Sequence, residues 1–181
     1  MNVLIACEFS GRVRDAFRKR GHRAVSCDLL ESETDGEHLQ CDVLSILNDG
    51  WDLMIAHPPC TYLCSSGARW WKSRRKEQKK ALEFVIALME SPIEKIAIEN
   101  PVGIISTAIR KPDQIIQPWM FGHGETKTTC LWLKNLFPLK PTNIVDGRLA
   151  KVYNSPDSKD RWKKRSRTYE GVADAMAAQW G

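Results

Sequence analysis

The sequence predicts an α/β protein in which a mostly parallel sheet is flanked by helices. Short apolar runs alternate with helix-like segments through the first half of the chain, and these runs end in polar residues or glycine. The composition, 43% hydrophobic and 27% charged over 181 residues, is that of an ordinary globular protein. At this length we expect a single domain over residues 1–181.

The first strand and helix are expected close to the start of the chain. Residues 3–9 form a nearly continuous apolar run that leads into a turn at Gly11, as a buried parallel strand does. A helix over residues 12–20 follows, because its apolar side chains recur on one face and Gly21 supplies a C-terminal stop.

Three further strands are expected over residues 24–27, 52–56 and 95–98. A helix over residues 72–90 separates the last two, since its apolar positions keep helical spacing. This alternation of strand and helix is typical of a parallel sheet.

The second half of the chain is less regular. A buried strand is expected over residues 129–133 and a helix over residues 171–180. Between them, Pro138, Pro141 and Pro156 punctuate a loop-rich stretch.

The sequence also indicates where the protein works. No apolar run approaches the roughly 20 residues that cross a bilayer, and the N-terminus lacks the basic start of a signal peptide. The six cysteines are scattered and form no Cys-x-x-Cys pair, which favours reduced thiols. We therefore expect a cytoplasmic protein without membrane contact.

Positive charge is concentrated in two stretches. The chain holds 27 Lys and Arg against 22 Asp and Glu, a net charge of +5. Residues 69–80 contain seven basic residues and one acid, and residues 151–169 contain seven and two. Both stretches carry aromatic residues, namely Trp70, Trp71, Tyr153, Trp162 and Tyr169. Basic charge among aromatic rings suits phosphates and unstacked bases, although a solvated helix face is the commoner cause of such charge taken alone.

Polar residues follow the predicted strands at their carboxyl ends, where parallel sheets bind ligands. They are Glu8, Phe9, Ser10, Gly11, Asp28, the His57-Pro-Pro-Cys60 turn and the Glu99-Asn-Pro101 segment. Carboxylates in such places can accept hydrogen bonds from a ribose or from an adenine amine. The Gly-x-Gly-x-x-Gly pattern is absent, which disfavours a dinucleotide site.

Two motifs are the most specific in the chain. Cys60 follows two prolines and precedes Gly67 by seven residues, and Glu99-Asn100 comes at the end of the next predicted strand. In this order the motifs resemble those of the DNA cytosine-5 methyltransferases, and the similarity spans nearly the whole chain. The resemblance implies a Rossmann-like S-adenosylmethionine-dependent methyltransferase fold. It also implies methyl transfer to C5 of cytosine, with DNA, duplex or single-stranded, as the expected partner.

The resemblance implies roles in catalysis for several residues. Cys60 is expected to be the nucleophile that adds to C6 of the base, as a thiolate favoured by a helix N-terminus or basic side chains. Glu99 is expected to bind N3 and the exocyclic amine, and burial there would let it carry a proton at neutral pH. Asn100 and Pro101 would hold its backbone, and Lys127 would contact the base or a phosphate.

S-adenosylmethionine is the cofactor that the resemblance implies. Phe9-Ser-Gly11 matches part of the family's cofactor motif, and Asp28 and Asp42 fall where the family places acids for the ribose and the adenine. The residues expected to bind it are Glu8, Phe9, Ser10, Gly11, Asp28, Asp42 and Pro58. For the two aspartates a helix-cap role is equally open.

The chain departs from the family pattern at several positions. Val13 replaces a glycine of the cofactor motif, Thr129 an arginine near the base, and Val172 an asparagine of the closing motif. Residues 134–167 span only 34 positions, where the family inserts a large target-recognition region. We therefore expect a compact enzyme whose selectivity is low or is supplied by a specificity partner, as would suit a phage or other mobile genetic element.

Two other functions stay open. The same thiolate and glutamate chemistry would serve on a free cytosine nucleotide, or the altered motifs would leave a nucleic-acid-binding module without turnover. A zinc site at His57, Cys60 and Cys64 is disfavoured because a fourth ligand is missing. Trp70 and Trp71 either stack on bases around an extruded target or pack onto the core.

Overall fold

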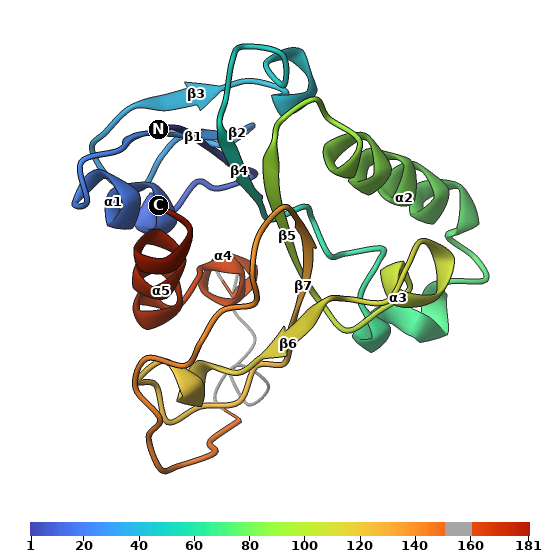
Figure 1. Cartoon of the computed structure of the whole chain (residues 1–181). Coiled ribbons are helices and arrows are strands. Elements are labelled where there is room, and N and C mark those ends of the chain that lie inside the picture. The colour runs from blue at the N-terminus through green and yellow to red at the C-terminus, as the bar shows by residue number, and fades with distance from the viewer. Residues whose placement is uncertain (151–160) are drawn as a thin grey trace.

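The computed structural model describes residues 1–150 and 161–181, and a seven-stranded sheet organises them (Figure 1). The strand order is β3-β2-β1-β4-β5-β7-β6. The strands are β1 (Asn2–Ala6), β2 (Arg23–Asp28), β3 (His38–Gln40), β4 (Leu53–Ala56), β5 (Lys95–Pro101), β6 (Gln114–Ile116) and β7 (Thr129–Lys134). The first five are parallel, whereas β7 runs antiparallel to both of its neighbours. The predicted mostly parallel sheet is confirmed.

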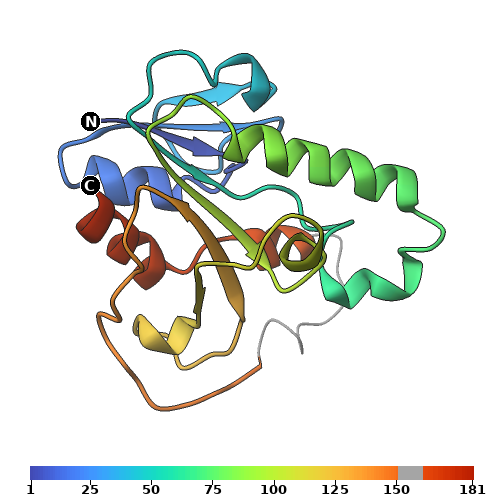
Figure 2. The same cartoon turned by 45° about the vertical axis from the view of Figure 1, so that its right-hand side comes forward.

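Helices cover both faces of this sheet, as Figures 1 and 2 show. On one face lie α1 (Arg12–Arg18) and α5 (Glu170–Trp180), and on the other lie α2 (Arg75–Met89) and α3 (Ile105–Ala108). The short helix α4 (Arg161–Ser166) leads into α5. Three 3-10 helices, η1 (Val43–Ser45), η2 (Ser65–Trp70) and η3 (Pro118–Met120), lie in the connections.

Alternate residues of each strand pack into the two apolar clusters that lie on opposite faces of the sheet. In β1, Val3 and Ile5 belong to the cluster that includes α1 and α5, while Leu4 and Ala6 belong to the cluster that includes α2. Successive side chains of a strand point to opposite faces, so a sheet with helices on both sides needs nearly continuous apolar strands. The continuous apolar run near the N-terminus is therefore explained by the burial of β1 on both of its faces.

The strand order reverses between β1 and β4, and this reversal positions the candidate site. β1 pairs in parallel with β2 on one side and with β4 on the other. The chain that leaves the carboxyl end of β1 therefore continues toward one edge of the sheet, and the chain that leaves β4 continues toward the other. Such a switch point opens a crevice for ligands at the carboxyl edge of the sheet. The turns after Ala6 and Ala56 both begin at this crevice.

Two predicted strand boundaries were wrong. The first strand ends at Ala6 because Cys7 adopts a positive φ of 58°, which turns the chain out of the sheet before residue 9. By contrast, β5 extends past residue 98 to Pro101, because β7 pairs with it as far as that residue. Glu99 and Asn100 therefore lie within a strand and not after it.

The remaining predicted elements lie close to their expected positions, with two helices shorter than expected. The helix expected over residues 12–20 ends at Arg18, and that expected over 72–90 covers Arg75–Met89. Tertiary structure adds the short edge strands β3 and β6 and the helices α3 and α4, which had not been predicted. No helix in the described part of the chain has the length and apolar character needed to cross a membrane.

Candidate active site

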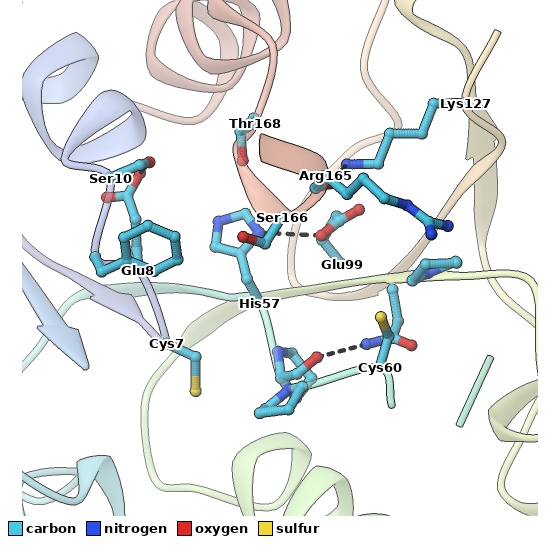
Figure 3. Close-up of a pocket in the computed structure, with 15 residues that line it drawn as sticks. Cys7, Glu8, Ser10, His57, Cys60, Glu99, Lys127, Arg165, Ser166 and Thr168 are labelled. Atoms are coloured by element: carbon cyan, nitrogen blue, oxygen red, sulfur yellow. Dashed lines mark hydrogen bonds and ion pairs between the residues drawn. The ribbon is translucent and has the colours of Figure 1, made fainter. Parts of the chain in front are cut away.

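A cavity of about 100 Å³ lies at the carboxyl ends of β1, β4 and β5 (Figure 3). The four residues expected to be catalytic all line it: Cys60, Glu99, Asn100 and Lys127. Four of the residues expected to bind the cofactor, Glu8, Phe9, Ser10 and Pro58, line it too. The structure therefore brings together side chains from strand ends that are far apart in the sequence.

The turn that carries Cys60 is held in place by β5. The carbonyl of Cys60 accepts backbone hydrogen bonds from Leu63 at 3.0 Å and Cys64 at 2.9 Å, which closes a tight turn after β4. The side-chain amide of Asn100, only 1% exposed, donates a 2.7 Å hydrogen bond to the carbonyl of Pro58. Asn100 thus fixes the neighbouring turn, rather than the backbone of Glu99 as expected.

The thiol of Cys60 is accessible but not activated in this state. Although the residue is exposed, burial of the sulfur is the largest cause that raises its pKa above that of an ordinary thiol. Nearby Cys64 and Glu99 raise the pKa further, and the positive charge of Lys127 only partly opposes them. Lys127 therefore favours the thiolate, as expected of a basic side chain, but its effect is smaller than that of burial and of the two neighbouring groups in the protein alone.

Glu99 is ionised rather than protonated. Burial raises its pKa, but the hydrogen bond from His57 and the charges of Lys127 and His57, helped by Thr129, outweigh burial, and the net pKa lies below the ordinary value. The Nδ1 atom of His57 and the Oε2 atom of Glu99 are 3.1 Å apart. In the protein alone, Glu99 is therefore not expected to carry a proton at neutral pH, and a proton on Glu99 beside a bound base stays a prediction.

The sequence placed His57 in the turn at a ligand-binding strand end and weighed it as a metal ligand, but gave it no catalytic role. In the described part of the chain no three His, Cys, Asp or Glu side chains are grouped to hold a metal. The imidazole instead points at Glu99 within the cavity, as Figure 3 shows. Its position directly after β4, beside the Cys60 turn, was the available signal for a role at the site.

Lys127 connects the cavity to α4. Its Nζ atom donates a 2.9 Å hydrogen bond to the carbonyl of Arg165 and lies 6.0 Å from the centre of the Tyr169 ring. Its backbone N–H donates to the side chain of Gln117 at 3.0 Å. The ammonium group is therefore placed at the cavity wall, and its contact with a base or phosphate stays a prediction.

Glu8 organises the turn between β1 and α1. Its buried carboxylate accepts hydrogen bonds from the backbone N–H groups of Val13 at 2.8 Å and Arg14 at 3.2 Å, and from the Ser10 hydroxyl at 3.2 Å. A carboxylate at a helix N-terminus satisfies free N–H groups and opposes the positive end of the helix dipole. Gly11 precedes the helix with φ of 71°, a conformation that favours glycine.

A second cavity, of about 560 Å³, lies beside the first. Its wall includes Asp28, Asp42 and apolar side chains such as Phe84, and it shares Cys7 and Pro59 with the first cavity. Asp42 caps η1 through a 3.0 Å hydrogen bond from Leu44 N, and Asp28 accepts one of 3.0 Å from Leu30 N. For Asp42 the capping role is therefore confirmed, and both aspartates also line the cavity.

The segment around α4 supplies cavity residues that had not been predicted, Arg165, Ser166 and Thr168. Besides the bond from Lys127 to Arg165, several contacts hold this segment against the rest of the protein. Arg12 donates to the carbonyl of Thr168 at 2.9 Å, Trp162 packs on Phe9 with ring centres 5.9 Å apart, and Arg167 pairs with Glu33 at 2.8 Å. The basic stretch at residues 151–169 was the signal for this wall, although Tyr153 lies outside the described residues.

Comparison with known proteins adds information on the fold. No family model and no curated protein sequence matches the chain. Among solved structures, an E. coli prophage protein assigned as a DNA modification methyltransferase is similar, with TM-score 0.53 and 18% identity over 87% of this chain and 56% of that one. A mutant of Spodoptera frugiperda DNMT2 has TM-score 0.49 and 14% identity, over 82% of this chain and 54% of that one.

The likeness to the prophage protein supports the class of fold. The chain has the Rossmann-like fold of a methyltransferase, with helices on both faces of a mostly parallel sheet, as predicted. It spans little more than half the length of the two solved structures.

Proposed function

We propose that this protein transfers a methyl group from S-adenosylmethionine to C5 of cytosine in DNA, through a covalent adduct on Cys60. The observation that carries this proposal is the meeting of Cys60 and Glu99 in one cavity at the switch point of a methyltransferase fold. A nucleophile and a carboxylate on neighbouring strand ends are what addition to a pyrimidine ring requires.

The two adjoining cavities fit S-adenosylmethionine in chemical terms. The larger one combines two carboxylates, Asp28 and Asp42, with apolar walls, which suits ribose hydroxyls and an adenine ring. The smaller one offers Phe9 and Ser10 next to Cys60. When bound, the cofactor supplies a methyl group on a positively charged sulfur. The shared residues Cys7 and Pro59 lie where a ligand would pass from one cavity to the other.

Three residues of the chain would have separate roles toward the cytosine ring. The thiolate of Cys60 would add to C6, which makes C5 electron-rich, and would leave again when C5 loses its proton. The carboxylate of Glu99 would accept a hydrogen bond from the exocyclic amine and hold the ring in the plane needed for attack. Asn100 would keep the sulfur in register with the ring, because it fixes the Pro58 carbonyl two residues before Cys60.

DNA is favoured as the substrate by the surface next to the Cys60 turn. Trp70 is 50% exposed, and the guanidinium groups of Arg69 and Arg74 lie 5.1 and 5.8 Å from its ring centre. An exposed indole with flanking positive charge can stack on a base beside an extruded target and contact phosphates.

A free cytosine nucleotide is a second candidate substrate. The cavity is small, and Arg165 and Ser166 of α4 form part of its wall. Residues 134–167 also leave only 34 positions where a target-recognition region would stand. Lys127 and Arg165 would then hold the nucleotide phosphate.

One pair of assays tests these assignments. Labelled methyl transfer is measured to duplex DNA, single-stranded DNA and free cytosine nucleotides, and trapping is measured on DNA carrying 5-fluorocytosine with S-adenosylmethionine present. We expect transfer and a stable adduct for the wild type and neither for Cys60→Ser. Transfer to the nucleotide alone would select the second candidate. DNA binding without transfer or adduct by either protein would overturn the catalytic proposal in favour of a binding module.

A further inference from the structure

His57 lines the cavity and has no part in the reaction as described so far. Its imidazole is 8% exposed, Glu99 is 15% exposed, and Nδ1 lies 3.1 Å from the carboxylate Oε2. Figure 3 shows the ring between the turn after β1 and the Glu99 carboxylate. A histidine paired with a carboxylate at this depth is a unit that can hold and move a proton.

The second ring nitrogen of His57 is the more informative atom. Nε2 is buried and has no hydrogen-bond partner among residues 1–150 and 161–181. A buried polar atom without a partner costs free energy, so its retention next to a cavity points to a ligand or to a proton-transfer role. A purely structural histidine would be expected to satisfy both nitrogens.

The charged and titratable groups that line the cavity with His57 lie on five different segments of the chain. They are Cys7 and Glu8 after β1, Cys60 after β4, Glu99 of β5, Lys127 before β7 and Arg165 of α4. Glu8 is already engaged by the N-terminus of α1, and Lys127 by the carbonyl of Arg165. Within the described residues, Glu99 is the carboxylate in direct contact with the imidazole.

We propose that His57 and Glu99 form a proton relay, in which a proton passes from His57 through Glu99 to N3 of the cytosine as Cys60 adds to C6. This inference rests on the proposed function and assigns to the pair the acid step that an ionised glutamate cannot supply alone. It also gives a role to a residue that the sequence motifs do not explain.

The atoms and electrons of the relay balance. The thiolate electron pair forms the S–C6 bond, the C5=C6 π pair moves toward C4, and the C4=N3 π pair moves to N3 and takes the proton from Glu99. Because Glu99 begins as a carboxylate, it receives this proton from Nδ1 of a protonated His57, which becomes neutral. The C4=C5 π pair would then form the bond to the methyl group that bound S-adenosylmethionine would supply, the methyl–sulfur bond would break with its electron pair staying on that sulfur, and C4=N3 would be restored. During elimination the C5 proton leaves to water, its electron pair restores C5=C6, the S–C6 bond breaks to restore the thiolate, and the N3 proton returns through Glu99 to His57.

Two isosteric variants separate proton transfer from positioning. In His57→Asn the side-chain NH₂ replaces the Nδ1 donor to Glu99 but carries no titratable proton. In His57→Gln the NH₂ instead replaces Nε2. If His57 acts only by orienting Glu99, His57→Asn should retain adduct formation, whereas a relay should fail in both variants.

The first measurement is the rate of trapping on 5-fluorocytosine DNA as a function of pH. We expect His57→Asn to be slower than wild type by about 100-fold near neutral pH, the size of a lost general acid. The alkaline limb of its profile should also move to lower pH by one unit or more, since the proton would then reside on a carboxyl group, whose ordinary pKa lies below that of an imidazole. A His57→Asn rate within about threefold of wild type, with an unchanged profile, would overturn the relay.

The second measurement needs no turnover. Proton NMR of the protein without ligand should show a low-field resonance from the hydrogen-bonded Nδ1–H of His57. It should vanish in Glu99→Gln and persist in Cys60→Ser, and its absence from the wild type would overturn the relay. A wild type that shows this resonance yet forms no adduct on any substrate would overturn the proposed function instead, so the two failures are distinguishable.

Discussion

The side-chain amide of Asn100 donates a 2.7 Å hydrogen bond to the backbone carbonyl of Pro58, so β5 holds the turn that carries Cys60. β4 and β5 are parallel neighbours, and this bond joins the chain segments at their carboxyl ends. The strand that carries Glu99 therefore also determines where the sulfur lies. One buried amide couples the two proposed reacting groups.

Asn100→Ala should weaken both stability and adduct formation. The substitution leaves the Pro58 carbonyl without its buried partner, and the free energy of unfolding should fall by about 1–3 kcal/mol. Urea denaturation checks this value. Trapping should slow by at least about tenfold, because the turn is no longer held in register. Gln179→Ala is the matched control, since its amide donates to the carbonyl of Lys140 at the surface, far along the chain from the site. Equal losses in the two variants would contradict the coupling.

The raised pKa of Cys60 predicts a slow, pH-dependent thiol reaction. Burial keeps the sulfur protonated at neutral pH, so alkylation by iodoacetamide should be slower than for free cysteine and should accelerate as pH rises above the ordinary thiol range. A bound sulfonium cofactor adds positive charge, which lowers the pKa and should speed the reaction at pH 7. Mass spectrometry of the Cys60 peptide measures the rate. Alkylation at pH 7 as fast as for free cysteine would contradict the assigned direction.

The central strands could be predicted because burial on both faces leaves a continuous apolar run. The edge strands β3 and β6 have three residues each and mixed exposure, so no pattern marks them in the sequence. Helix α4 has no buried residue, and its basic composition is that of a solvated segment. Its place at the cavity depends on long-range contacts such as Arg167 with Glu33.

The site residues could be predicted better than their chemical states. Strand ends of a parallel sheet converge, so Cys60 and Glu99 could be expected to meet. Their protonation depends on partners that only the fold supplies. His57 and Lys127 outweigh the burial of Glu99, while burial of the Cys60 sulfur outweighs Lys127. Sequence order does not show which of these opposing effects is larger.

Asp28→Asn and Asp42→Asn should weaken cofactor binding. Both aspartates line the larger cavity, and a hydrogen bond to a charged group is worth about 1.5–3 kcal/mol, so the Kd of S-adenosylmethionine should rise about tenfold or more for each. Isothermal titration calorimetry measures the change. The control is Asp49→Asn, an exposed aspartate of the same connection that does not line the cavity. Unchanged affinity in both cavity variants would place the cofactor elsewhere.

A methyl group at position 11 should disturb the turn between β1 and α1 and a buried charge together. Gly11 and Gly50 have similar positive φ values of 71° and 80°, so alanine is strained by about 1–2 kcal/mol at either position. Only at Gly11 would the new Cβ also overlap the Thr34 hydroxyl and lie 2.6 Å from the guanidinium of Arg14. That guanidinium is fully buried and donates to the Thr34 hydroxyl at 2.7 Å.

Gly11→Ala should therefore lose about 1–3 kcal/mol of stability beyond the loss in Gly50→Ala, because a packed side-chain network must shift. Thermal and urea unfolding of the two variants measure the difference, and cofactor titration should show weaker binding for Gly11→Ala alone. If the two variants unfold at the same denaturant concentration, the hydrogen-bonded side chains around Arg14 rearrange without lowering the free energy of unfolding. Glycine at position 11 would then be required only for its backbone conformation.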